Sequence, residues 1–116
     1  MHTIIIAEAG VNHNGSLEMA KQMALKAKEC GADMVKYQTA VPELVISKFA
    51  EKAEYQKETT GSAESQLEMV RKLHFDFAAH KELKEYCDSI GIAYLSAPFD
   101  IPSVKFLGSL HLPAIK

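Results

Sequence analysis

Short apolar runs alternate with longer amphipathic segments along this chain. The runs have the length and the β-branched content of buried strands, and they occupy residues 3–8, 33–39 and 92–97. The segments between and after them carry apolar residues at helical spacing, which predicts helices between residues 14 and 31, 62 and 73, 76 and 91, and 102 and 110. Strands that alternate with helices form parallel sheets, so the pattern predicts an α/β fold.

Capping residues mark the expected ends of two helices. Asn14 or Ser16 can cap the first helix, and Gly31 closes it. Asp76 can cap the helix that ends at Gly91. These positions support the boundaries that the apolar spacing indicates.

Two segments extend this simple alternation. Residues 40–62 have mixed charges and turn-forming residues, so we expect an excursion on the carboxyl-terminal side of the strands, partly helical around 49–56. Residues 113–116 begin a fourth strand. A parallel sheet needs helices on both faces or closure into a barrel, and an eight-stranded barrel typically takes about 250 residues. With 116 residues, the chain is too short for such a barrel, so we expect residues 1–116 to form the first part of a larger barrel domain.

Composition adds mainly exclusions. A net charge of −2 gives no basic footprint for nucleic acid or for an anionic membrane surface. No apolar run approaches the roughly 18 residues of a spanning helix, and no basic segment precedes the first apolar run, so we expect a cytoplasmic protein. Cys30 and Cys87 lack metal or redox spacing, and we expect both to pack on apolar helix faces.

Polar residues gather where the predicted strands end. Alternation places Lys36 and Gln38 on one face of the second strand, while Glu8 ends the first strand. Ser96 follows on the third strand, and Lys116 on the fourth. If the strands are neighbours in register, these five side chains surround one mouth. Two lysines suit a phosphate or carboxylate, and a carboxylate beside them can orient a hydroxyl or move a proton.

The loop after the first strand adds three polar side chains above Glu8, from Asn12, His13 and Asn14. Structural interpretations compete with the functional ones. Glu8 and Lys36 can form a structural ion pair, His13 can fix the loop, and Tyr37 can pack in the helix layer. The remaining histidines lack metal-ligand spacing, which favours surface or capping roles for His2, His74, His80 and His111.

Six motifs occur in order and identify a family by resemblance. They are Ile-Ala-Glu-Ala-Gly-Val-Asn-His-Asn-Gly-Ser, Gly-Ala-Asp-Met-Val-Lys-Tyr-Gln-Thr, Lys-Ala-Glu-Tyr-Gln-Lys, Glu-Ser-Gln-Leu-Glu-Met, Leu-Ser-Ala-Pro-Phe-Asp and Pro-Ala-Ile-Lys. Together they span nearly the whole chain. The chain resembles the sialic acid synthase family, which comprises bacterial N-acetylneuraminate synthases and relatives that make other nonulosonic acids.

The resemblance implies a (β/α)8 TIM barrel, of which this chain supplies about three and a half βα units. It implies condensation of phosphoenolpyruvate with an N-acetylmannosamine-type sugar. Mn²⁺ or Mg²⁺ would be held by ligands outside this chain. A homodimer is also implied, in which an antifreeze-like domain absent from this chain completes the partner's active site. Lys36 and Lys116 match lysines that hold phosphoenolpyruvate, and Glu8 and Gln38 match positions near the sugar and the reacting centre.

The chain departs from the family at one motif. Relatives usually carry Ser-Thr-Pro-Phe, where the threonine helps to hold phosphate, but this chain has Ala97. A backbone N–H or Ser96 can substitute. The family's metal-binding histidines, catalytic glutamate and partner arginine match positions beyond Lys116, so we expect residues 1–116 alone to be inactive. The alternatives are another phosphate-handling barrel enzyme, such as an aldolase, and a non-catalytic binding or assembly module.

Overall fold

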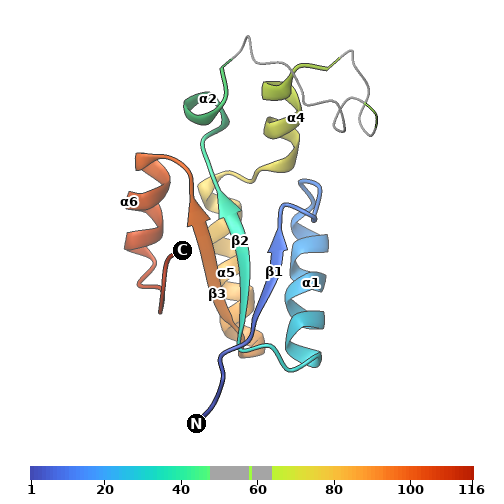
Figure 1. Ribbon diagram of the computed structural model, residues 1–116, viewed down its shortest axis with the longest axis vertical. Coiled ribbons are helices and arrows are strands. Elements are labelled where there is room, and N and C mark those ends of the chain that lie inside the picture. Colours follow the sequence, from blue (N-terminus) through green and yellow to red (C-terminus); the bar gives the residue numbers. More distant parts are fainter. Residues whose placement is uncertain (48–57, 59–63) are drawn as a thin grey trace.

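The computed structural model describes residues 1–47, 58 and 64–116. Its centre is a parallel sheet of three strands in the order β1-β2-β3 (Figure 1), with β1 at Ile6–Gly10, β2 at Met34–Thr39 and β3 at Ala93–Pro98. Helices separate the strands along the chain, which confirms the predicted α/β class.

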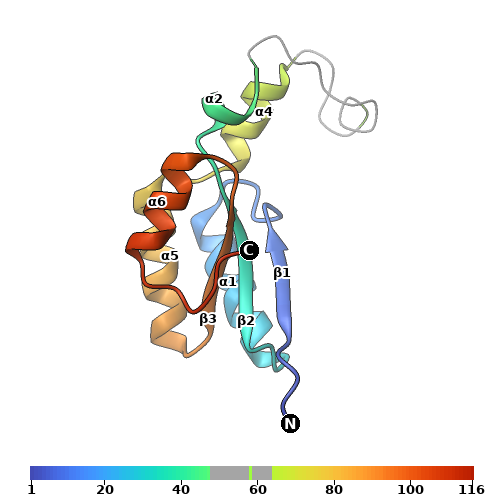
Figure 2. The same cartoon turned by 60° about the vertical axis from the view of Figure 1, so that its left-hand side comes forward.

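Three helices pack against one face of the sheet, as Figures 1 and 2 show: α1 (Leu17–Glu29), α5 (Phe77–Ile90) and α6 (Ile101–Ser109). Two shorter helices, α2 (Pro42–Val45) and α4 (Gln66–Leu73), lie together beyond the carboxyl ends of the strands. The helix expected around residues 49–56 lies outside the described residues. Within the described part of the chain, no helix combines the length and the apolar character needed to cross a membrane.

Side-chain caps explain where the helices begin. The Ser16 hydroxyl accepts a hydrogen bond from the Met19 N–H at 3.2 Å, so Ser16 rather than Asn14 caps α1. Asp76 caps α5 in the same way as predicted, accepting from the Ala79 N–H at 2.8 Å. Ser65 caps α4, which therefore begins later than predicted, at Gln66.

The core lies between the helices and the face of the sheet that carries Val35, Tyr37 and Tyr94. Ala20 lets α1 approach the sheet closely, and its carbonyl accepts a 2.8 Å hydrogen bond from the Tyr37 hydroxyl. The packing interpretation of Tyr37 is thus confirmed. Cys87 is also buried in this core, as expected.

Three sequence-based expectations about local structure are wrong. Cys30 is exposed because it is the C-cap residue of α1. The first strand begins at Ile6 rather than at residue 3, because β2 starts only at Met34 and the Ile5 N–H bonds to the Asp33 carboxylate at 2.7 Å. Residues 113–116 form no strand, although the Lys116 N–H reaches the Ser96 carbonyl of β3 at 3.3 Å.

The second face of the sheet is largely open. Ile4 and Ile6 are 56% and 45% exposed there. The carboxyl-terminal residues pass in front of this face (Figure 2) and cover part of it, so that Lys36 and Leu95 are buried. This partly covered face carries the candidate site.

Candidate functional site

The strand register brings Glu8 and Lys36 to the same face of the sheet. Their Cα atoms are partners across β1 and β2, and cross-strand partners point to the same side. A bulge follows Glu8, because Gly10 rather than Ala9 pairs with Tyr37. Gln38 lies two residues beyond Lys36 on that face, as alternation along β2 predicts.

Glu8 and Lys36 form an ion pair between the Glu8 carboxylate and the Lys36 Nζ. The Lys36 side chain is only 5% exposed, whereas that of Glu8 is 60% exposed. A buried ammonium group needs such a partner, because removing an unpaired charge from water costs about several kcal/mol. The predicted pairing therefore exists, and it leaves the carboxylate open to solvent beside the amine.

Lys116 joins this pair at a hollow of about 400 Å³ on the open face. Glu8, Lys36 and Lys116 supply its charged lining, and Ile6, Leu95, Ala114 and Ile115 supply its apolar lining. Lysine side chains outnumber carboxylate side chains, two to one, in this charged lining. Such a setting suits a small anion.

Ser96 does not belong to this group, and its predicted position is wrong. It pairs in register with Tyr37, so its side chain lies on the helix-covered face. There it is fully buried, and its hydroxyl shares a 2.7 Å hydrogen bond with that of Thr39. Ser96 consequently cannot replace the hydroxyl that Ala97 lacks.

Ala97, rather than Ser96, lies on the face of the sheet that carries the site. It pairs in register with Gln38, and it therefore points to the face that carries Lys36. A hydroxyl at residue 97 would reach the site, whereas the alanine methyl offers no hydrogen bond. The Gln38 amide is half-buried at the neighbouring position, 3.9 Å from where a Cβ would stand on Gly10.

The loop after β1 exposes Asn12 and Asn14 and buries His13. The His13 Nδ1 accepts a 3.1 Å hydrogen bond from the Gly15 N–H, and its ring stacks on Phe75. Burial, with a smaller contribution from nearby His74, lowers the pKa of His13 to about 4. The ring is therefore neutral near pH 7, and its contacts match the loop-fixing interpretation.

Sequence reasoning missed His80, which is fully buried instead of lying at the surface. Its Nδ1 is 2.8 Å from the Tyr94 hydroxyl, while its Nε2 has no hydrogen-bond partner. Burial, chiefly, lowers its pKa to about 4. The signal was present, since His80 precedes the buried Leu83 by three residues and Cys87 by seven on α5.

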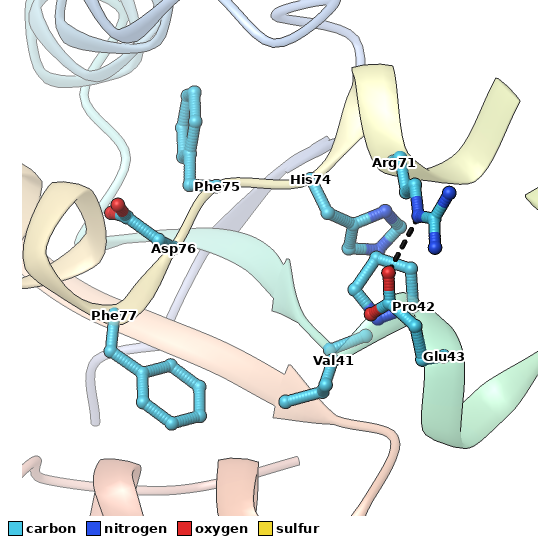
Figure 3. Close-up of a pocket in the computed structure, with 9 residues that line it drawn as sticks. Val41, Pro42, Glu43, Arg71, His74, Phe75, Asp76 and Phe77 are labelled. Atoms are coloured by element: carbon cyan, nitrogen blue, oxygen red, sulfur yellow. Dashed lines mark hydrogen bonds and ion pairs between the residues drawn. The ribbon is translucent and has the colours of Figure 1, made fainter. Parts of the chain in front are cut away.

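A second hollow of about 320 Å³ lies beyond the end of β2, between α2 and the start of α5 (Figure 3). Its charged lining includes Arg71 and Glu43, which form an ion pair with each other, and Asp76, which caps α5. The hollow beside Lys36 is therefore the better anion site, because its positive charge exceeds its negative charge.

Metal binding finds no support within residues 1–47, 58 and 64–116, where no three His, Cys, Asp or Glu side chains cluster closely enough to hold an ion. The described residues thus do not themselves fit the divalent ion that the family resemblance implies. Its ligands would have to come from elsewhere.

The chain matches the NeuB family over residues 23–116. It is 51% identical over 114 residues to the N,N'-diacetyllegionaminic acid synthase of Campylobacter jejuni, a match that covers 98% of this chain and 34% of that protein. The enzyme of the same name from Legionella pneumophila is 45% identical over 116 residues, which cover all of this chain and 33% of that protein.

Solved structures give the same result for the fold. The N-acetylneuraminic acid synthetase of Leptospira borgpetersenii superposes with a TM-score of 0.76 at 25% identity, covering 99% of this chain and 35% of that one. The βα units described above match the N-terminal part of its TIM barrel. The chain spans about a third of the length of these relatives.

Proposed function

Because the chain belongs to the NeuB family, we propose that it forms the first part of the active site of a nonulosonic acid synthase. The reaction is the condensation of phosphoenolpyruvate with a 2-acetamido sugar, with release of phosphate. One observation carries the assignment of residues: buried Lys36 pairs with open Glu8 in the same hollow as Lys116. The other barrel strands, the antifreeze-like domain and the homodimer belong to this proposal as parts outside residues 1–116.

The two lysines act as fixed positive charges for the phosphate and carboxylate of phosphoenolpyruvate. The enol carbon of phosphoenolpyruvate bonds to the aldehyde carbon of the open-chain sugar, and the aldehyde oxygen takes up a proton to become a hydroxyl. Water adds at the carbon that bears phosphate and gives up a proton. The tetrahedral intermediate then loses phosphate to give the keto acid. Charges that are held in place before reaction stabilise these steps, because they need no reorganisation as charge develops.

Glu8 lies where it can act on the acceptor. Its carboxylate is bound to Lys36 on one side and open on the other, so it can orient a sugar hydroxyl or take a proton. Gln38 supplies an amide donor and acceptor on the same face, and Asn12 and Asn14 supply further polar groups from the loop. When bound, a divalent ion would polarise the aldehyde carbonyl, while the residues of this chain bind and orient the two substrates.

The acceptor is proposed to be an N-acetylmannosamine-type sugar, and its diacetamido 6-deoxy analogue is favoured. The relatives at 51% and 45% identity are both N,N'-diacetyllegionaminic acid synthases. The human N-acetylneuraminate-9-phosphate synthase is 37% identical over 113 residues, covering 97% of this chain and 31% of that protein. Higher identity to the diacetylated class supports the second acetamido group.

A chimera tests the proposal, in which residues 1–116 replace the matching third of the Campylobacter jejuni synthase. We expect phosphate release from phosphoenolpyruvate that depends on added sugar, faster with the diacetamido sugar than with N-acetylmannosamine. The unmodified relative is the positive control. Borohydride with a carbonyl substrate should trap no covalent adduct, whereas a Schiff base on Lys36 or Lys116 would indicate an aldolase. Phosphate release at a rate that does not depend on either sugar would contradict the proposal.

A further inference from the structure

Phe75 lies in the linker that joins α4 to α5, and it is buried at 8% exposure. Figure 3 shows the side chains of Phe75, in this linker, and of Phe77, the first residue of α5, pointing in opposite directions. The Phe75 ring stacks on His13, with centroids 4.0 Å apart and planes inclined by 15°. The Phe75 ring also meets the ring of His80 edge-on, with centroids 5.5 Å apart and planes inclined by 72°. Phe75 therefore joins the loop after β1 to the helix layer.

A backbone contact lies one residue beyond Asn14. A Cβ atom built on Gly15 would stand 2.1 Å from the carbonyl oxygen of Lys72, in the last turn of α4. Gly15 also has φ +77°, a conformation that favours glycine. The loop and the end of α4 thus approach more closely than any side chain at residue 15 allows.

The backbone hydrogen bonds of this loop join it to itself and to the end of β1. The Asn12 N–H bonds to the Ala9 carbonyl and the Asn14 N–H to the Val11 carbonyl, both at 3.1 Å. These bonds shape the loop, but they do not place it relative to α4 and the linker that follows α4. The contacts at His13 and Gly15 do so, while the side chains of Asn12 and Asn14 stay exposed.

From these contacts we infer that Phe75 is a positioning residue, which holds residues 11–15 in place at the carboxyl end of β1 and so sets the affinity for the acceptor sugar. The identity of the substrate in this inference rests on the proposed function, whereas the role of Phe75 in holding the loop rests on the packing contacts alone. Phe75 touches no substrate itself. It acts through His13, because a loop displaced by about 1 Å no longer presents its polar groups correctly.

Phe77 provides a matched control for Phe75. It is an aromatic residue two positions away, and it stacks on Phe106 at 4.4 Å with planes inclined by 4°. Its ring points away from Phe75, so Phe77→Leu removes a comparable stack and leaves the stack of Phe75 on His13 in place. Gly31 is the control for Gly15, because it has φ +87° and nothing within 4 Å of its built Cβ.

The experiment measures hydrogen exchange and kinetics on the chimera. In Phe75→Leu, amide exchange across residues 11–16 should rise while exchange in β2 stays unchanged. The KM for the acceptor sugar should rise about fivefold, which corresponds to the loss of one ordinary hydrogen bond. The KM for phosphoenolpyruvate should stay unchanged. Gly15→Ala should give the same two results if Phe75→Leu does not fold. Phe77→Leu and Gly31→Ala should give neither.

Two outcomes overturn the inference. One is loop exchange in Phe75→Leu and Gly15→Ala that matches the two controls. The other is faster loop exchange with the acceptor KM unchanged, which would separate the loop from sugar binding. A chimera that turns over neither sugar contradicts the proposed function instead, and loop exchange, which needs no turnover, then decides whether Phe75 holds the loop.

Discussion

Replacing Lys36 with methionine separates a binding role from a structural one. The side chain is 5% exposed, and its ammonium pairs with Glu8 at the edge of the hollow. Methionine fills the space of the aliphatic stem and removes the buried charge. Glu8 is 60% exposed, so water can solvate its carboxylate once the partner is gone.

The two roles predict different magnitudes. Loss of a charge-assisted hydrogen bond to phosphoenolpyruvate costs roughly 1.5–3 kcal/mol, which is about a tenfold to hundredfold weaker Kd. The stability change should be within about 1 kcal/mol, because the substitution removes the desolvation cost of the ammonium along with the ion pair. For a domain of barrel size, this amounts to about 2–4 °C in Tm.

Titration calorimetry of phosphoenolpyruvate into the chimera measures the first quantity, and thermal unfolding measures the second. Lys84→Met is the control, because Lys84 pairs with Asp88 on the outer side of α5, away from the hollow. It should change neither the Kd nor, by more than about 1 kcal/mol, the stability. A Kd for phosphoenolpyruvate that stays within about twofold in Lys36→Met, a small part of the loss predicted above, would refute the reasoning.

Three further predictions concern the site and its support. Glu8→Gln should lower kcat while leaving Tm nearly unchanged, since the amide is close in shape but cannot take a proton; a lower Tm with kcat retained would show a structural ion pair instead. Ala97→Thr should lower the KM for phosphoenolpyruvate about fivefold, by placing a hydroxyl beside Gln38, and an unchanged KM would contradict this placement. Burial lowers the pKa of His80 to about 4, so the neutral ring contributes its full stability above pH 6.5, and this contribution is lost as the pH falls toward 4. In His80→Gln, Tm should fall less across this pH range than in the unmodified protein, and an equal fall would show that His80 does not titrate there.

Local patterns were enough to predict most elements and the face of the sheet on which Lys36 and Gln38 lie. Alternation along β2 depends on one strand only, and it placed Lys36 and Gln38 on the same face correctly. The position of Glu8 at the end of the first apolar run likewise placed it beside Lys36. Helical spacing and capping residues located α1 and α5, because both signals act over a few residues.

The placements that single segments could not predict depend on how one segment lies against another. Ser96 was assigned to the wrong face because its side depends on the register of β3 with β2, which single-strand alternation does not contain. The stack of Phe75 on His13 and the approach of Gly15 to Lys72 join segments about sixty residues apart. No local sequence signal specifies such contacts.

A crystal structure of the chimera with phosphoenolpyruvate tests the central claim most directly. The ligand should occupy the hollow that Glu8, Lys36 and Lys116 line, with its phosphate and carboxylate oxygens about 2.7–3.2 Å from the two lysine Nζ atoms. The Ser96 hydroxyl should still bond to Thr39 on the opposite face. Phosphoenolpyruvate bound elsewhere, with the Glu8–Lys36 pair untouched, would contradict the assignment of this hollow as the anion site.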